Sequence, residues 1–305
     1  MSPERPDRLT LLAFSTTILL GGANFVAVRF SNRELPPFWG ASLRFAVASL
    51  LFFALVAALR LALPRRRALL GAVLYGTLTF GGTYALLYWG LVQVPAGLAS
   101  LIMASGPLLT LLFAVAHRLE PFRLRGLLGA LLALAGIGLM FAGPAQTNIP
   151  LLSLLAVLAG AACAAEASVL VKMLPGAHPI TTNALGMASG ALVLLAFSLL
   201  AGEARALPTE PDTWMALAYL VLLGSVGLFA LFLFVIRRWT ASATAYAFVL
   251  FPLVAVVLSA LLEGEPVTLG LLAGGALVPA GVYLGALKTA TLSHPKSRRE
   301  SRSRR

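Results

Sequence analysis

Long apolar runs alternate with short polar links along almost the whole chain. A membrane-spanning helix needs about 20 mostly apolar residues. Ten stretches satisfy this requirement: 9–29, 37–60, 67–89, 94–117, 123–142, 150–171, 180–201, 212–236, 241–262 and 267–287. Proline or charge marks most of the links between them, as at Pro36 and Pro64. The pattern predicts an all-α membrane protein with ten transmembrane helices.

The segment 85–139 occurs a second time, 145 residues later, as 230–284. Leucine matches mean little in so apolar a chain, so the evidence comes from the other aligned pairs. These are Pro107 with Pro252, Glu120 with Glu265, Gly129 with Gly274, and Gly136 with Gly281. Such a repeat indicates two homologous halves. We place them at 1–147 and 148–288, and we expect the basic tail 289–305 to be disordered.

The number of spans and the distribution of charge predict how the halves sit in the membrane. Five spans per half is an odd number, so the second half must enter the membrane from the side opposite to the first. Inverted repeats of this kind occur in many secondary transporters, whose substrate sites lie near the midplane between the repeats. With the N-terminus inside, 19 of the 23 lysine and arginine residues are cytoplasmic, which is a positive-inside signal. Both termini are therefore predicted to be cytoplasmic.

Composition excludes a soluble domain and limits the kinds of molecule that the chain could bind. Mean hydropathy is +0.92 and charged residues make up 11% of the chain, against about 25% in soluble proteins. The net charge of +12 could suggest nucleic acid, but no aromatic residues interleave the basic tail. We expect that tail to be attracted to anionic lipid of the bilayer instead. A single cysteine, Cys163, excludes a disulfide framework and a cysteine-based metal site, and we predict no metal and no cofactor.

Arg44 and Asn24 are candidate substrate-binding residues. Arg44 lies seven residues after Pro37, about 10 Å along its helix, where a charge must face protein or water and not lipid. Asn24 lies at similar depth in the first span. The pair could hold a substrate carboxylate on the outer part of a cavity. Alternatively, Arg44 binds freed backbone carbonyls and locks helices together, or snorkels toward the outer face.

Glu166 and the two central prolines are further candidates. Glu166 is the only acidic residue well inside a span. It could be a proton site or a partner for a substrate ammonium, or it could simply face a cytoplasmic water funnel. Pro107 and Pro252 cannot donate to the carbonyls four residues back, those of Met103 and Phe248. They are either hinges in a cavity wall or ordinary kinks repaired by neighbouring groups.

Aromatic side chains supply the remaining candidates. Tyr84 and Tyr88 are four residues apart in the third span and so share a face. Phe232 in the eighth span, with Tyr246 and Phe248 in the ninth, adds rings from the second half. These side chains could form a flat apolar wall for a substrate. They could equally serve as helix packing or as an interfacial belt.

Several local motifs occur in a fixed order around these residues. They are Gly21-Gly22-Ala23-Asn24-Phe25, Arg44-Phe45, Ser105-Gly106-Pro107, Leu119-Glu120, Phe251-Pro252 and Gly264-Glu265. With the ten spans and the repeat, they resemble the drug/metabolite transporter superfamily in its EamA branch. The chain departs from that branch at Gly22, where tryptophan is common. Within the branch it is most similar to bacterial YddG-type aromatic amino acid exporters.

The resemblance implies an exporter of amino acids, aromatic ones included, and of similar small metabolites. It also implies alternating access in the bacterial inner membrane, by a monomer or a homodimer. A drug or nucleotide-sugar carrier of the same superfamily is the alternative within transport. An intramembrane enzyme would need paired catalytic groups, whereas the chain has no H-E-x-x-H motif, no P-loop and only isolated polar residues inside its spans. We therefore predict no catalytic residues.

Overall fold

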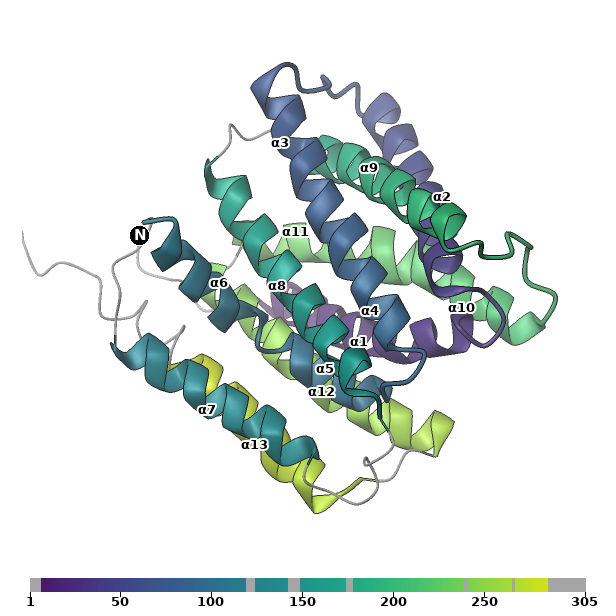
Figure 1. The fold of residues 1–305 in the computed structure, drawn as a ribbon. Helices are drawn as coiled ribbons and strands as arrows, with labels where there is room; N and C mark the ends of the chain where they lie inside the picture. Colours follow the sequence, from purple (N-terminus) through teal and green to yellow (C-terminus); the bar gives the residue numbers. More distant parts are fainter. Residues whose placement is uncertain are drawn as a thin grey trace, which may run out of the picture.

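The computed structural model describes residues 7–118, 124–141, 149–173, 178–238, 241–264 and 267–284. Helices make up all the regular secondary structure in these ranges (Figure 1). The first half contains α1 (Arg8–Ser31), α2 (Pro37–Ala58), α3 (Arg67–Gly76), η1 (Thr77–Thr83), α4 (Tyr84–Gly90), α5 (Ala96–Met103), α6 (Gly106–Ala116) and α7 (Leu124–Phe141). The second half contains α8 (Leu151–Met173), α9 (Pro179–Leu200), α10 (Pro211–Val221), η3 (Leu222–Gly227), α11 (Leu228–Arg238), α12 (Ala241–Glu263) and α13 (Leu269–Val282).

Seven helices in the described ranges are long and apolar enough to cross a membrane. Three further apolar helices are shorter: 127–139, 249–262 and 269–281. The prediction of an all-helical, multi-spanning protein is therefore confirmed for these ranges, while the count of ten crossing helices stays a prediction. The cytoplasmic location of the termini also stays a prediction, because residues 1–6 and 285–305 lie outside the described part of the chain.

The offset of 145 residues found in the sequence also relates the helices. It carries α1 onto α8, α2 onto α9, α5 and α6 onto α12, and α7 onto α13. Two equivalent pairs pack directly together, α2 on α9 and α7 on α13, and Figure 1 shows these pairs on opposite sides of the molecule. In addition, α1 packs on α12, while its equivalent α8 packs on α5 and α6. Each half thus contributes its first helix to the other, and the halves are interlocked.

The third predicted span of each half contains a π-helical segment at the equivalent position. In the first half η1 lies between α3 and α4, and in the second half η3 lies between α10 and α11. A π-helical turn widens the helix and redirects backbone carbonyls, and such turns are frequent at functional sites. The hydroxyl of Thr83 donates to the carbonyl of Leu78 at 3.1 Å, and that of Ser225 donates to the carbonyl of Leu220 at 2.9 Å. Each bond reaches five residues back and so bridges the widened turn.

The two central prolines have different surroundings. In the first half the helix is broken, since α5 ends at Met103 and α6 begins at Gly106 with Pro107 in its first turn. In the second half α12 is continuous and Pro252 lies inside it. The predicted irregularity is therefore a break in the first half only. That either proline acts as a hinge stays a prediction.

Two carboxylates bind the α1–α2 and α9–α10 loops together. Glu203 accepts hydrogen bonds from the backbone N–H groups of Phe38 and Trp39, at 3.1 and 2.8 Å, and so caps the first turn of α2. In return, Glu34 accepts from the side chain and backbone of Thr209, just before α10. These bonds, with that of the Thr209 hydroxyl first, lower the pKa of Glu34 to about 2, so its carboxylate stays ionised at physiological pH. Both loops therefore lie on one side of the molecule, as the topology prediction requires.

Helices α3 and α9 approach so closely at Gly76 and Gly186 that a Cβ atom on Gly76 would overlap the backbone of Gly186. Glycine at this crossing lets two backbones meet, which is a common way of packing membrane helices. A Cβ atom on Gly138, in α7, would instead have no atom of another residue within 4 Å. The two glycines thus offer a test of the crossing.

We predict that Gly76→Ala lowers the free energy of unfolding by about 1–3 kcal/mol, because the added methyl group forces α3 and α9 apart. The matched control, Gly138→Ala, should be neutral or stabilising by up to about 1 kcal/mol, because alanine is the better helix former. Unfolding of the purified protein in detergent micelles, followed by circular dichroism, measures both. Equal stability of the two variants would show that the crossing is not tightly packed.

Candidate functional site

A cavity of about 380 Å³ lies between the two halves. Its walls come from α1, α2, the α3–η1–α4 helix, α5, α8, α11 and α12. Most lining side chains are apolar, and hydroxyls of Thr79, Thr83, Ser100 and Ser168 are interspersed among them. Sites for small molecules are mostly apolar hollows of roughly 300–1,000 Å³ with a few placed polar groups. The size and lining therefore fit a small organic molecule.

Arg44 is fixed at one side of this cavity by residues of the opposite half. Its Nη2 donates to the carbonyl of Gly224 at 3.0 Å, and its Nε donates to the hydroxyl of Ser225 at 3.0 Å. Both acceptors belong to the π-helical segment η3. Nη1 donates to the hydroxyl of Tyr88 at 3.3 Å. An arginine of α2 thus binds the widened turn of the second half, as expected if Arg44 binds freed carbonyls.

The charge of Arg44 is balanced by dipoles and rings. Among the described residues no carboxylate forms an ion pair with it, and its side chain is 0% exposed. Its guanidinium carbon lies 4.9 Å from the ring centroid of Phe45 and 5.2 Å from that of Tyr84, within the range of cation–π attraction. Arg44 borders the cavity but exposes no surface into it. Direct contact with a ligand therefore needs a movement of the wall.

Asn24 shares the acceptor that Arg44 uses. Its Nδ2 donates to the carbonyl of Gly224 at 3.2 Å. Its Oδ1 is buried and finds no hydrogen-bond donor within the described ranges. Glycine is required at position 224, because a Cβ atom there would overlap the amide of Asn24. The predicted proximity of Asn24 and Arg44 is therefore present, and Asn24 lines the cavity with its Oδ1 buried against Gly224.

The predicted aromatic face is formed, but only part of it reaches the cavity. Tyr84 lines the wall and packs edge-on against Phe45, with ring centroids 4.6 Å apart. The ring centroid of Tyr84 lies 6.3 Å from that of Phe80, which stacks on it, and 6.2 Å from that of Tyr88. Phe80 and Tyr88 are both fully buried and neither lines the cavity. Tyr88 instead supports Arg44, which is a role the sequence did not indicate.

Of the other predicted residues, some line the cavity and others do not. Met103 and Phe232 both line the cavity. Tyr246 and Phe248 belong to α12, but their side chains lie outside the part of the chain that the structure describes. Glu166 is not on the wall. Its Oε1 lies 2.7 Å from Nε2 of His117, just beyond the end of α6, so the carboxylate links α8 to that end.

Sequence reasoning missed Gly224, Ser225 and the hydroxyls that line the cavity. One signal for Gly224 was available, since its repeat equivalent is Thr79, another cavity residue. Thr79 and Thr83 are also four residues apart, a spacing that places side chains on one helix face. The sequence carried no comparable signal for the π-helical register that exposes the Gly224 carbonyl to Arg44.

Known proteins resemble this chain over most of its length. The profile of the EamA-like transporter family matches twice, over residues 8–142 and 151–286, once in each predicted half. An uncharacterized inner membrane transporter of Escherichia coli K12, YedA, is 31% identical over 249 residues, which cover 81% of this chain and 80% of YedA. A probable amino-acid metabolite efflux pump of Salmonella typhimurium LT2 is 28% identical over 283 residues, which cover 88% and 91% of the two chains.

A solved crystal structure also resembles the fold. Its TM-score is 0.64 at 22% identity, and the superposition covers 94% of this chain and 99% of that chain. At this identity the likeness shows the fold alone. The family profile and the relative YedA carry the assignment, and they agree with the apolar helices of the structure. The chain therefore belongs to the EamA-like transporter family within the drug/metabolite transporters, and it is a multi-pass transporter of the inner membrane.

Proposed function

We propose that this transporter exports amino acids, aromatic ones included, and similar small metabolites by alternating access. The observation that carries the proposal is the cavity between the halves, which has a buried cation at one side and aromatic rings on its walls. An amino acid has matching parts, namely a carboxylate, an ammonium and an apolar side chain. The similarity to a probable amino-acid metabolite efflux pump supports the same substrate class.

Arg44 favours an anionic group in the cavity. Because no described carboxylate pairs with Arg44, its field acts on whatever enters the space beside it. At an effective dielectric constant of 20, a carboxylate about 4 Å from a cation gains about 4 kcal/mol. Wall movement that exposes the guanidinium would allow direct hydrogen bonds as well, since Arg44 has five N–H groups and three named acceptors.

Asn24 suits the ammonium group of the same substrate. Its nitrogen is already bonded to Gly224, so the atom that remains available is the acceptor Oδ1. Because Oδ1 is buried against Gly224, the same wall movement that exposes Arg44 has to expose it. A substrate ammonium could then donate to it and satisfy an oxygen that otherwise has no described partner. This refines the sequence-based prediction, which assigned Asn24 to the carboxylate end.

The aromatic lining suits the substrate side chain. Tyr84 from the first half faces the same cavity as Phe229, Phe232 and Phe251 from the second. Flat rings on several walls provide apolar contact for phenylalanine-like side chains without excluding smaller ones. We expect weak binding, as alternating access requires release on the other side.

Movement between inward-open and outward-open states would use the interlocked halves. We place both termini in the cytoplasm and the loops joined by Glu34 and Glu203 on the outer face. The helix break before Pro107 adjoins the cavity residue Met103. We assign the hinge role to this break, with Pro252 as its counterpart in the second half.

Counterflow in liposomes that contain the pure protein tests the substrate class. We expect labelled phenylalanine to exchange against internal phenylalanine and other amino acids, in a saturable manner. Tyr84→Ala should raise KM for phenylalanine by about 2- to 13-fold, the equivalent of about 0.5–1.5 kcal/mol for a lost aromatic contact. Alanine transport should change less.

The control for that experiment is Tyr283→Ala, because Tyr283 is exposed at the end of α13 and does not line the cavity. Unchanged phenylalanine-to-alanine ratios in Tyr84→Ala would show that the aromatic wall is assigned wrongly. Counterflow of drugs or nucleotide sugars, with none of any amino acid, would replace the proposal with the alternative carrier.

Arg44→Gln separates a ligand role from a helix-locking role. If its charge attracts the substrate carboxylate, the variant should lose phenylalanine transport much more than transport of phenylethylamine, which lacks the carboxylate. Detergent stability of each variant is measured in parallel, because the substitution also removes bonds to η3. Arg205→Gln, in an exposed loop, is the control. An equal loss for both substrates would leave Arg44 with a structural role alone.

A further inference from the structure

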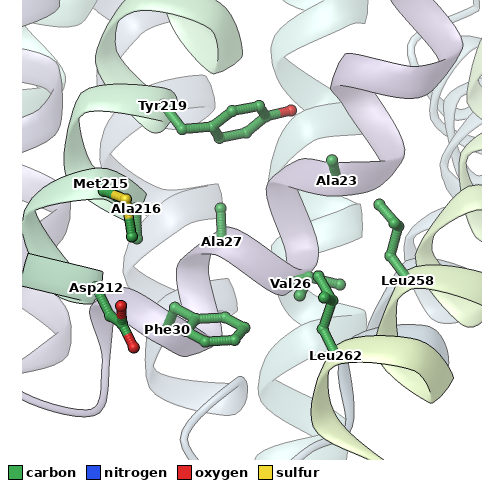
Figure 2. A pocket seen from close by; sticks show the side chains of 10 residues that line it. All are labelled: Ala23, Val26, Ala27, Phe30, Asp212, Met215, Ala216, Tyr219, Leu258 and Leu262. Atoms are coloured by element: carbon green, nitrogen blue, oxygen red, sulfur yellow. The ribbon is translucent and has the colours of Figure 1, made fainter.

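A second hollow lies between α1, α10 and α12, and Figure 2 shows the part of it that includes Asp212. Among the described residues, none that lines this hollow lines the central cavity. It consists of two adjoining parts of about 360 and 500 Å³, which share Ala23, Tyr219 and Leu258. We refer to both parts together as the lateral groove. The hydroxyl of Tyr219 donates to the carbonyl of Leu20 at 2.8 Å, and this bond joins α10 to α1 within the groove.

The groove exists because small residues line its α1 side. Ala23 and Ala27 are four residues apart and so lie on one face of α1, and Ala216 faces the same space from α10. Close packing forms the base, since a Cβ atom on Gly22 would overlap Val254 of α12. Larger side chains at these alanines would fill the hollow. The groove therefore follows from the small residues that the sequence places at this helix contact.

The surroundings identify the medium that the groove faces. Leu19, Leu253 and Leu262 line it and are exposed by 58%, 64% and 57%. They lie on apolar helices of a membrane protein, so the surface they form contacts the bilayer hydrocarbon. A lipid acyl chain is accordingly the apolar molecule available to fill the groove.

The length of the groove matches one leaflet. Along α1 it extends from Leu19 to Phe30, which is about 16 Å at the helical rise of about 1.5 Å per residue. Half of a bilayer hydrocarbon core is about 15 Å thick. The groove is therefore long enough for one acyl chain of a single leaflet, with the head group at one end.

Asp212 marks the end where the head group would lie. It is the only charged residue among the described residues that line the groove, and Figure 2 shows it beside Phe30, away from Tyr219. Trp214, exposed and bonded through Nε1 to the carbonyl of Pro208, indicates the membrane–water interface at this level. Asp212 also suits the positive end of the α10 dipole, but that role does not require an adjoining apolar groove.

We propose that the lateral groove binds one acyl chain of a phospholipid whose head group carries a protonated amine, with that amine paired to Asp212. The chain fills the space over Ala23 and Ala27, and the carboxylate selects an aminophospholipid over an anionic one. A carboxylate at the interface attracts an ammonium and repels a lipid of net negative charge. The groove thus defines a lipid site separate from the transport cavity.

Native mass spectrometry of the purified protein tests this proposal, after equilibration with equal amounts of phosphatidylethanolamine and phosphatidylglycerol that carry identical acyl chains. We expect the wild type to retain one phosphatidylethanolamine, several-fold over phosphatidylglycerol. Asp212→Asn should remove the preference and keep lipid retention. Ala27→Leu should reduce retention of both lipids, because it fills the groove, and Ala23→Leu should do the same.

Two controls accompany these variants. Glu210→Gln removes the same charge two residues before Asp212, at a residue that does not line the groove, and Ala54→Leu adds the same bulk at an exposed position of α2. Both should retain lipid as the wild type does, and circular dichroism checks that all variants are folded. Equal retention of the two lipids by the wild type would overturn the proposal. So would unchanged retention in both alanine variants, or a lipid-free dimer that the same variants disrupt.

Discussion

The binding of Arg44 to the π-helical segment of the opposite half is the interaction on which the site depends. A guanidinium buried in a membrane protein must find polar partners, because hydrocarbon offers none. Here the carbonyl of Gly224, the hydroxyl of Ser225 and the hydroxyl of Tyr88 provide them. In an ordinary α-helix the carbonyl of Gly224 would accept a hydrogen bond from the N–H four residues later in the same helix. In η3 the N–H of Leu228, which would donate to Gly224 in an α-helix, donates to the carbonyls of Leu223 and Ser225 instead. The irregular helix and the buried charge therefore explain each other.

The two repeats build a similar scaffold, and the site lies where their sequences differ. The repeat equivalent of Arg44 is Ser189, whose hydroxyl donates to the carbonyl of Val73 in α3 at 3.3 Å. Both halves therefore use their second helix to bind a backbone carbonyl of the other half. Only the first half does so with a charge. Its positive field, with Asn24 beside it, makes the side of the cavity formed by the first half different from the side formed by the second.

The larger features could be predicted from sequence because they follow from composition and periodicity. Apolar runs gave the helices, aligned prolines and glycines gave the repeat, and the depth of Arg44 indicated a buried position near Asn24. The details depended on contacts between distant segments. Tyr88 has the spacing of a wall residue, yet the rotation of the helix turns it toward Arg44.

Glu166 illustrates the same limit. Nothing in its surrounding sequence indicates that His117, 49 residues away, lies within 2.7 Å of it. The π-helical segments were missed for a related reason, since a change of helical register leaves the apolar pattern almost unaltered. Of these two features only the π-helical segments belong to the site, since η1 lines the cavity and η3 supplies acceptors for Arg44.

The central claim is that the cavity beside Arg44 holds the transported substrate. Site-specific protection tests it most directly, with Met103→Cys in a Cys163→Ala background and a small membrane-permeant thiol reagent. Ala201→Cys, in an exposed position after α9, is the reference thiol. Saturating phenylalanine should slow labelling at position 103 several-fold and leave position 201 unchanged. Identical labelling rates at position 103 with and without phenylalanine, in a protein shown to transport it, would contradict the claim.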